Sequence, residues 1–111
     1  MNTWLVGMSV DVDDVEMMVN FLVSAADLAH AEAGIQAMGR TWWPSLSRED
    51  DGHRWLYPQG VVWLNCIILL DDVENIILRG FKFLDVWVIS GKPDAPVITD
   101  EYGNDWRDIT R

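Results

Sequence analysis

The chain is poor in cysteine, in long apolar runs and in basic residues. Cys66 is the single cysteine among 111 residues, so an internal disulfide bond is excluded. One cysteine is consistent with a reducing compartment. The longest apolar run, 61–70, is about half of the roughly 20 residues that a membrane-spanning helix requires. The first residues also lack the basic segment of a secretory signal. We therefore expect a cytoplasmic protein.

Basic residues are scarce and come late. The sequence has 8 Lys and Arg against 18 Asp and Glu, a formal net charge of −10, and its first basic residue is Arg40. Such a charge repels nucleic acids and anionic membranes and attracts basic proteins. We expect a basic protein partner, without direct binding to nucleic acid or membrane. The alternative is that the acidity serves only solubility.

Motifs for metal binding and catalysis are missing too. The acidic segment 11–16 does not fit a calcium-binding loop, because its sixth position is Glu16 and its twelfth is Leu22. Two histidines, His30 and His53, and one cysteine are too few for a standard zinc site. Neither a glycine-rich phosphate loop nor a nucleophile elbow is present. We therefore expect no metal, no cofactor and no enzymatic activity.

Apolar patterns are what the sequence does contain. The run 61–70, interrupted only by Asn65, predicts a central strand covered on both faces. Alternation over 3–12 predicts a half-buried strand. Residues 14–38 predict one long helix, capped by Asp13 or Asp14. Its expected apolar face comprises Met18, Phe21, Leu22, Ala25, Leu28, Ala29 and Ala33.

The expected fold is a single α+β domain over residues 1–111. One long helix packs on a mostly antiparallel sheet of four to five strands, in the order β-α-β-β-β with a C-terminal hairpin. Segment 71–80 fits either a helix bracketed by Asp72 and Gly80 or a strand, and its Ile-Ile-Leu content favours the strand. Segment 81–90 predicts a further strand and 91–96 a loop. Gly103 with Asn104 predicts the turn of the final hairpin.

Two segments combine acidic residues with aromatic ones. The irregular stretch 39–60 and the C-terminal tail both pair carboxylates, which attract a basic partner, with aromatic rings, which supply contact area. The alternative is that the aromatics of 39–60 pack back over the sheet as a satellite core. The predicted partner-binding residues are Trp42, Trp43, Glu49, Asp50, Asp51, Trp55, Asp100, Glu101, Tyr102, Asp105, Trp106 and Asp108.

These features favour a small inhibitory binding protein that blocks a basic surface of a nucleic-acid-handling enzyme or complex. In size, acidity and lack of catalytic residues the chain resembles phage anti-defence proteins such as anti-CRISPRs, and the immunity proteins of bacterial toxins. The resemblance is one of general character and assigns no residue a role. Two alternatives are a homodimeric structural or assembly protein, and a small ligand-binding domain or enzyme whose pocket is lined by Trp63, Phe83 and Trp87.

Overall fold

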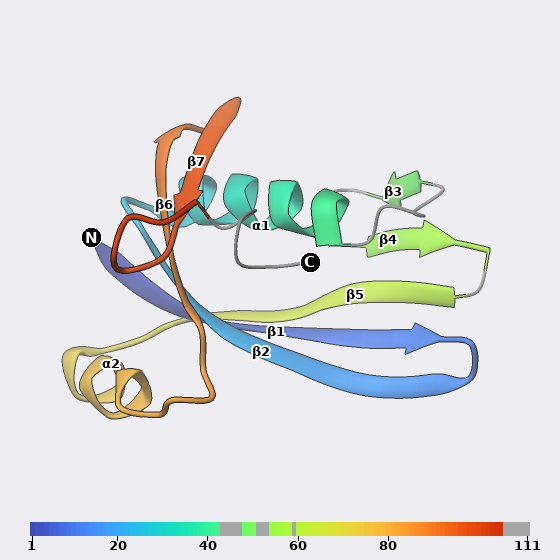
Figure 1. Ribbon diagram of the computed structural model, residues 1–111, viewed down its shortest axis with the longest axis horizontal. Coiled ribbons are helices and arrows are strands. Elements are labelled where there is room, and N and C mark those ends of the chain that lie inside the picture. The colour runs from blue at the N-terminus through green and yellow to red at the C-terminus, as the bar shows by residue number, and fades with distance from the viewer. Residues whose placement is uncertain (43–47, 51–53, 59, 106–111) are drawn as a thin grey trace.

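The computed structural model describes residues 1–42, 48–50, 54–58 and 60–105 (Figure 1). Within these residues seven strands form one sheet in the spatial order β3-β4-β5-β1-β2-β6-β7. All neighbouring strands are antiparallel except β2 and β6, which are parallel. The elements are β1 (Asn2–Val12), β2 (Val15–Ala25), α1 (Leu28–Trp42), β3 (Arg48–Asp50), β4 (Arg54–Tyr57), β5 (Gly60–Leu69), α2 (Asp72–Arg79), β6 (Val86–Lys92) and β7 (Ala95–Thr99).

The expected architecture of one long helix on four to five strands is wrong. The strand predicted at 3–12 is present as β1, but residues 15–25 form a second long strand instead of the first half of a helix. The helix begins only at Leu28. Asp27 caps it, since its carboxylate accepts a hydrogen bond from the backbone N–H of His30 at 2.9 Å. This bond, with one from the His30 ring, holds the pKa of Asp27 below its ordinary value.

Two aspartates reverse the chain between β1 and β2. Asp13 and Asp14 have φ angles of 53° and 63°, the left-handed conformation that two-residue type I′ hairpin turns require at both positions. Aspartate tolerates this conformation better than most residues. Pairing continues from Val12 opposite Val15 to Asn2 opposite Ala25. The acids expected to cap a helix therefore close a hairpin.

The core lies between α1 and one face of the sheet (Figure 1). Alternate residues of β1 point to this inner face, as the sequence pattern predicts. The neighbouring strands and α1 contribute the remaining side chains. Buried inner-face residues include Trp4, Val6, Met8, Val10, Phe21, Val23, Ala31, Ile35, Met38, Trp55, Val62, Trp87, Ile89 and Ile98.

Two glycines let α1 lie directly on the sheet. A Cβ atom on Gly34 would lie 2.2 Å from Cδ1 of Ile89 on β6. A Cβ atom on Gly39 would lie 2.5 Å from Cζ2 of Trp55 on β4. Because β6 and β4 are separated by three strands in the sheet, α1 spans most of the inner face.

The segment 61–70 forms a strand, as predicted, but the prediction that both of its faces are covered is wrong. In β5 only Val62 is buried, whereas Trp63 and Ile68 are exposed on the other side. Gly7 pairs with Cys66 and the next residue of β1 pairs with Leu64, which leaves Asn65 as the extra residue of a β-bulge. Asn65 is exposed there, so the one polar residue of the run meets water.

Three C-terminal predictions need correction. Within 71–80, residues Asp72–Arg79 form helix α2 and not the favoured strand. Its N-cap is Asp71, which accepts a hydrogen bond from the Glu74 backbone N–H at 2.8 Å while its own N–H donates to the Glu74 carboxylate at 3.0 Å. The strand expected over 81–90 begins only at Val86, and the loop expected over 91–96 is part of the β6–β7 hairpin.

The turn predicted at Gly103 is present. Gly103 has a φ of 88°, and Thr99 forms an isolated bridge with Asp105 across the turn. The rest of the expected C-terminal hairpin, from residue 106 onward, lies outside the described residues.

We predict that Gly34→Ala lowers the free energy of unfolding by about 1–2 kcal/mol, because the added methyl group collides with the buried Ile89 side chain. The clash outweighs the roughly 1 kcal/mol by which alanine is favoured over glycine in a helix. Urea denaturation measures the change. Adding Ile89→Val, which removes the nearest atom, should recover part of the loss. A Gly34→Ala variant more stable than the wild type would contradict the packing of α1.

We predict that Asp14→Gly raises the free energy of unfolding by about 0.5–1 kcal/mol, because glycine adopts a positive φ without steric cost. Thermal unfolding followed by circular dichroism is a suitable measurement. A loss of about 1 kcal/mol, as for glycine inside a helix, would indicate that the chain does not turn here.

Candidate partner-binding surface

Helix α2 is amphipathic, but its apolar face points to solvent, whereas the apolar face of a surface helix usually packs on the core. Val73, Ile76 and Ile77 share one face by their i, i+3 and i+4 spacing, and this face points to solvent. Ile76 retains 75% of its accessible surface. Asn75 and Arg79 lie on the side that meets the sheet. None of the helix residues is fully buried, Asn75 and Leu78 are half-buried, and the side chains of Val73, Ile76 and Ile77 are uncovered.

The loop after α2 enlarges this apolar area. Phe83 is 78% exposed and Phe81 is 43% exposed, and their ring centroids lie 5.4 Å apart. Figure 1 places α2 and this loop on the side of the sheet opposite to α1. We refer to Val73, Ile76, Ile77, Phe81 and Phe83 as the α2 surface. Large exposed apolar patches on soluble proteins commonly mark binding sites, and these exposed side chains are a candidate for one.

Acidic residues flank the start of the α2 surface. Asp71, Asp72 and Glu74 occupy the cap and first turn of the helix, where negative charge also suits the helix dipole. Cap geometry fixes the orientation of Asp71 and Glu74 through their reciprocal hydrogen bonds. The apolar face is therefore bordered at one end by anchored negative charges.

Arg79 attaches α2 to the sheet. Its Nη2 donates hydrogen bonds to the hydroxyls of Ser24 at 2.6 Å and Thr3 at 3.1 Å. These two hydroxyls are opposite each other on β2 and β1 and lie 3.1 Å apart. Nε donates to Asn75 within the helix at 2.6 Å, and Nη1 forms an ion pair with Glu101. One side chain thus joins α2, the β1–β2 hairpin and the turn after β7.

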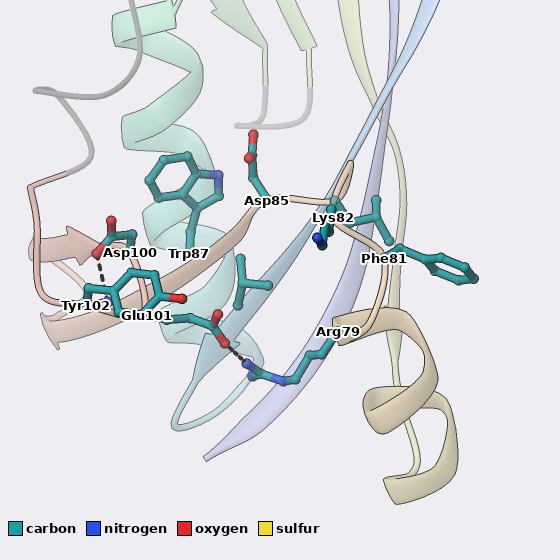
Figure 2. A pocket seen from close by; sticks show the side chains of 10 residues that line it. Arg79, Phe81, Lys82, Asp85, Trp87, Asp100, Glu101 and Tyr102 are labelled. Carbon is teal, nitrogen blue, oxygen red and sulfur yellow. Dashed lines mark hydrogen bonds and ion pairs between the residues drawn. The ribbon is translucent and has the colours of Figure 1, made fainter.

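A pocket of about 320 Å³ lies beside this attachment (Figure 2). The loop between α2 and β6 forms one side, and the turn after β7 forms the other. Apolar walls and five charged residues alternate around it. The lining residues are Arg79, Phe81, Lys82, Leu84, Asp85, Val86, Trp87, Asp100, Glu101 and Tyr102.

Asp100 organises the turn on one side of the pocket. Its Oδ1 accepts hydrogen bonds from the backbone N–H groups of Tyr102 at 2.8 Å and Asn104 at 2.9 Å, and its Oδ2 accepts one from the Asn104 side chain at 3.0 Å. The Asn104 side chain is the largest cause that lowers the pKa of Asp100 below its ordinary value. The carboxylate of Asp100 is therefore committed to the turn.

The structure divides the predicted residues of the tail from those of the loop. Asp100, Glu101 and Tyr102 come together at the pocket, and Tyr102 is almost fully exposed. Asp105 lies at the far side of the same turn. A partner-binding role for these four residues remains a prediction. Trp106 and Asp108 lie outside the described residues.

The predicted partner-binding residues of segment 39–60 lie in several different places. Trp55 is completely buried against α1, which is the core position that the alternative for this segment expects, and a partner-binding role for it stays a prediction. Trp42 ends α1, and Glu49 and Asp50 belong to β3, opposite Trp55 and Arg54. Two further predicted residues, Trp43 and Asp51, lie outside the described part of the chain.

The alternative aromatic pocket has no support from the positions of its residues. Trp87 belongs to the core, while Trp63 lies across the sheet under the guanidinium of Arg54, at 5.0 Å. Phe83 projects from the loop after α2. The pocket described above includes Trp87 but neither of the other two.

Sequence reasoning missed the α2 surface. The signal was present in the spacing of Asp71 and Glu74, a capping box that marks a helix start. Once 72–79 is read as a helix, Val73, Ile76 and Ile77 fall on one face. The Ile-Ile-Leu content outweighed this signal and favoured a strand.

The described residues contain no cluster of three or more His, Cys, Asp or Glu side chains suited to hold a metal ion. In the same residues, no helix combines the length and apolar content needed to cross a membrane. Comparison with protein-family models, curated proteins and solved structures finds no significant match.

We predict that Arg79→Ala releases α2 from the sheet, because it removes the hydrogen bonds to Thr3 and Ser24 and the ion pair with Glu101. Hydrogen–deuterium exchange over 72–79 should accelerate, and the free energy of unfolding should fall by about 1–3 kcal/mol. Lys82→Ala is the control, since Lys82 forms no ion pair with another described residue. Equal exchange in both variants would contradict the attachment.

Proposed function

We propose that this protein binds a basic protein partner through the α2 surface and inhibits that partner by covering it. The outward apolar face of α2 is the observation that carries the proposal. A helix with Val73, Ile76 and Ile77 in water is suited to insert these side chains into a groove on another protein.

The exposed side chains favour a macromolecular partner over a small ligand. Ile76, Ile77 and Phe83 are exposed and do not line the described pocket, so a partner must supply the groove that covers them. Aromatic and branched aliphatic side chains at the centre of a contact provide most of its binding energy when they enter apolar pockets. The partner should therefore present an apolar groove at least one helix turn long.

The charge of the chain supports a basic partner. With a formal net charge of −10 and acids at the start of α2, the protein attracts positive surfaces over long range. Proteins that handle nucleic acids carry such surfaces. An acidic protein seated there excludes the nucleic acid by steric block and by charge. Two copies of this chain repel each other, which disfavours a homodimer at the same surface.

We predict that Ile76→Ser weakens partner binding about 10- to 100-fold, because burial of an isoleucine side chain contributes about 1.5–3 kcal/mol. The partner is first captured from host lysate with the immobilised wild-type protein and identified. It is then purified, and its affinity for each variant is measured by calorimetry. Val97→Ser, at a comparably exposed apolar position on β7, is the matched control and should bind as the wild type does.

Nucleic-acid binding by the purified partner should fall when wild-type protein is added, and Ile76→Ser should lose this effect. Sedimentation should show a monomer. A dimer that Ile76→Ser dissociates would replace the proposal with self-association. Equal binding by Ile76→Ser and the wild type would exclude the α2 surface.

A further inference from the structure

The pocket beside α2 adjoins the proposed contact surface. Phe81 belongs to both, and Arg79 ends the helix and lines the pocket (Figure 2). A partner seated on the α2 surface therefore lies against the mouth of the pocket. A volume of about 320 Å³ is enough for one long side chain with its neighbouring backbone.

Two of the charged side chains that line the pocket already use their donors or acceptors in hydrogen bonds within the protein. Arg79 uses Nε, Nη1 and Nη2 on Asn75, Glu101, Thr3 and Ser24. The two oxygens of Asp100 accept three hydrogen bonds within its own turn. These two groups stabilise the walls of the pocket and have little capacity left for a ligand.

Three other charged groups of the lining still have atoms that are available to bind a ligand. Glu101 pairs with Arg79 through Oε1, which leaves Oε2 available. Asp85 and Lys82 have no hydrogen bond or ion pair through their side chains to any other described residue. Over the whole lining, three carboxylates stand against one guanidinium and one ammonium group, which gives the pocket a preference for cations. Tyr102 adds an aromatic ring, which attracts cations and packs on aliphatic stems, whereas the ring of Phe81 points away from Tyr102 (Figure 2).

We infer that the pocket receives a cationic side chain of the partner, an arginine or a lysine, whose stem packs on the apolar walls while its charge meets Asp85, the lining carboxylate without a hydrogen bond or ion pair to another described residue. The inference rests on the proposed function, because it names the group by which the basic partner is anchored beside the α2 surface. Arginine suits the site better than lysine, since its planar head stacks on rings and donates to carboxylates in a fixed geometry.

The test is a nitrogen-15 NMR titration of the isolated protein with N-acetyl-arginine methylamide, and with N-acetyl-glutamate methylamide as the charge-reversed control. The arginine compound should shift amide resonances of 81–87 and 100–104, with millimolar affinity, and the glutamate compound should not. Asp85→Asn should weaken the binding up to about fivefold, and Lys82→Gln should strengthen it by a similar factor, as expected for single solvent-exposed charge pairs.

Stronger binding of the glutamate compound, or the opposite response of the two variants, would overturn the inference in favour of an anion site. Shifts confined to the acidic hairpin turn at 11–16, or no shifts, would also overturn it. Ile76→Ser should bind the arginine compound as the wild type does. If the compound fails to bind while Ile76→Ser still loses the partner, the pocket inference fails and the proposed function stands.

Discussion

The long β1–β2 hairpin is the constraint on which the rest of the structure depends. Asp13 and Asp14 turn the chain at positive φ, and the two strands then stay in register from Val12–Val15 to Asn2–Ala25. One face of the hairpin is apolar and receives α1, which approaches closely because of Gly34 and Gly39. The other face carries the Thr3–Ser24 hydroxyl pair, and this pair receives Arg79. The register of the β1–β2 hairpin therefore determines both the packing of α1 on its inner face and the attachment of Arg79 to its outer face.

This division explains why α2 differs from α1. The core is completed on the inner face without α2, so the second helix is free to present its apolar residues to solvent. Uncovered Ile76 and Phe83 do not contribute to the stability of the isolated chain, and they gain free energy only when a partner buries them. The acids of the first turn and the pocket beside Arg79 then add charge selectivity to an apolar contact. Inhibition of a basic, nucleic-acid-handling protein is the function that we propose on this basis.

The sequence predicted those elements in which one pattern was unambiguous. Alternation along β1 identified the inner-face residues Trp4, Val6, Met8 and Val10 but not the burial of Thr3 on the other face, and Gly103 marked a turn. Residues 15–25 were predicted wrongly because Met18, Phe21, Leu22 and Ala25 fit a helical face as well as a strand. In the strand, Met18 and Leu22 lie on the face opposite to Phe21 and Ala25. The turn before residues 15–25 determines that they form a strand. In this turn two aspartates adopt a left-handed conformation that composition alone does not reveal. For the proposed contact surface, charge and aromaticity selected Glu101 and Tyr102, whose role in binding stays a prediction. They did not select Ile76, because an apolar helix face that lies in water cannot be recognised by assuming that apolar residues are buried.

The most direct measurement of the central claim is hydrogen–deuterium exchange of the full chain, free and in complex with its purified partner. The account predicts that the complex protects residues 72–85 together with 100–104, while exchange in α1 and at the hairpin turn 12–15 is unchanged. Protection confined to α1 or to the hairpin turn, with 72–85 exchanging as in the free protein, would contradict it.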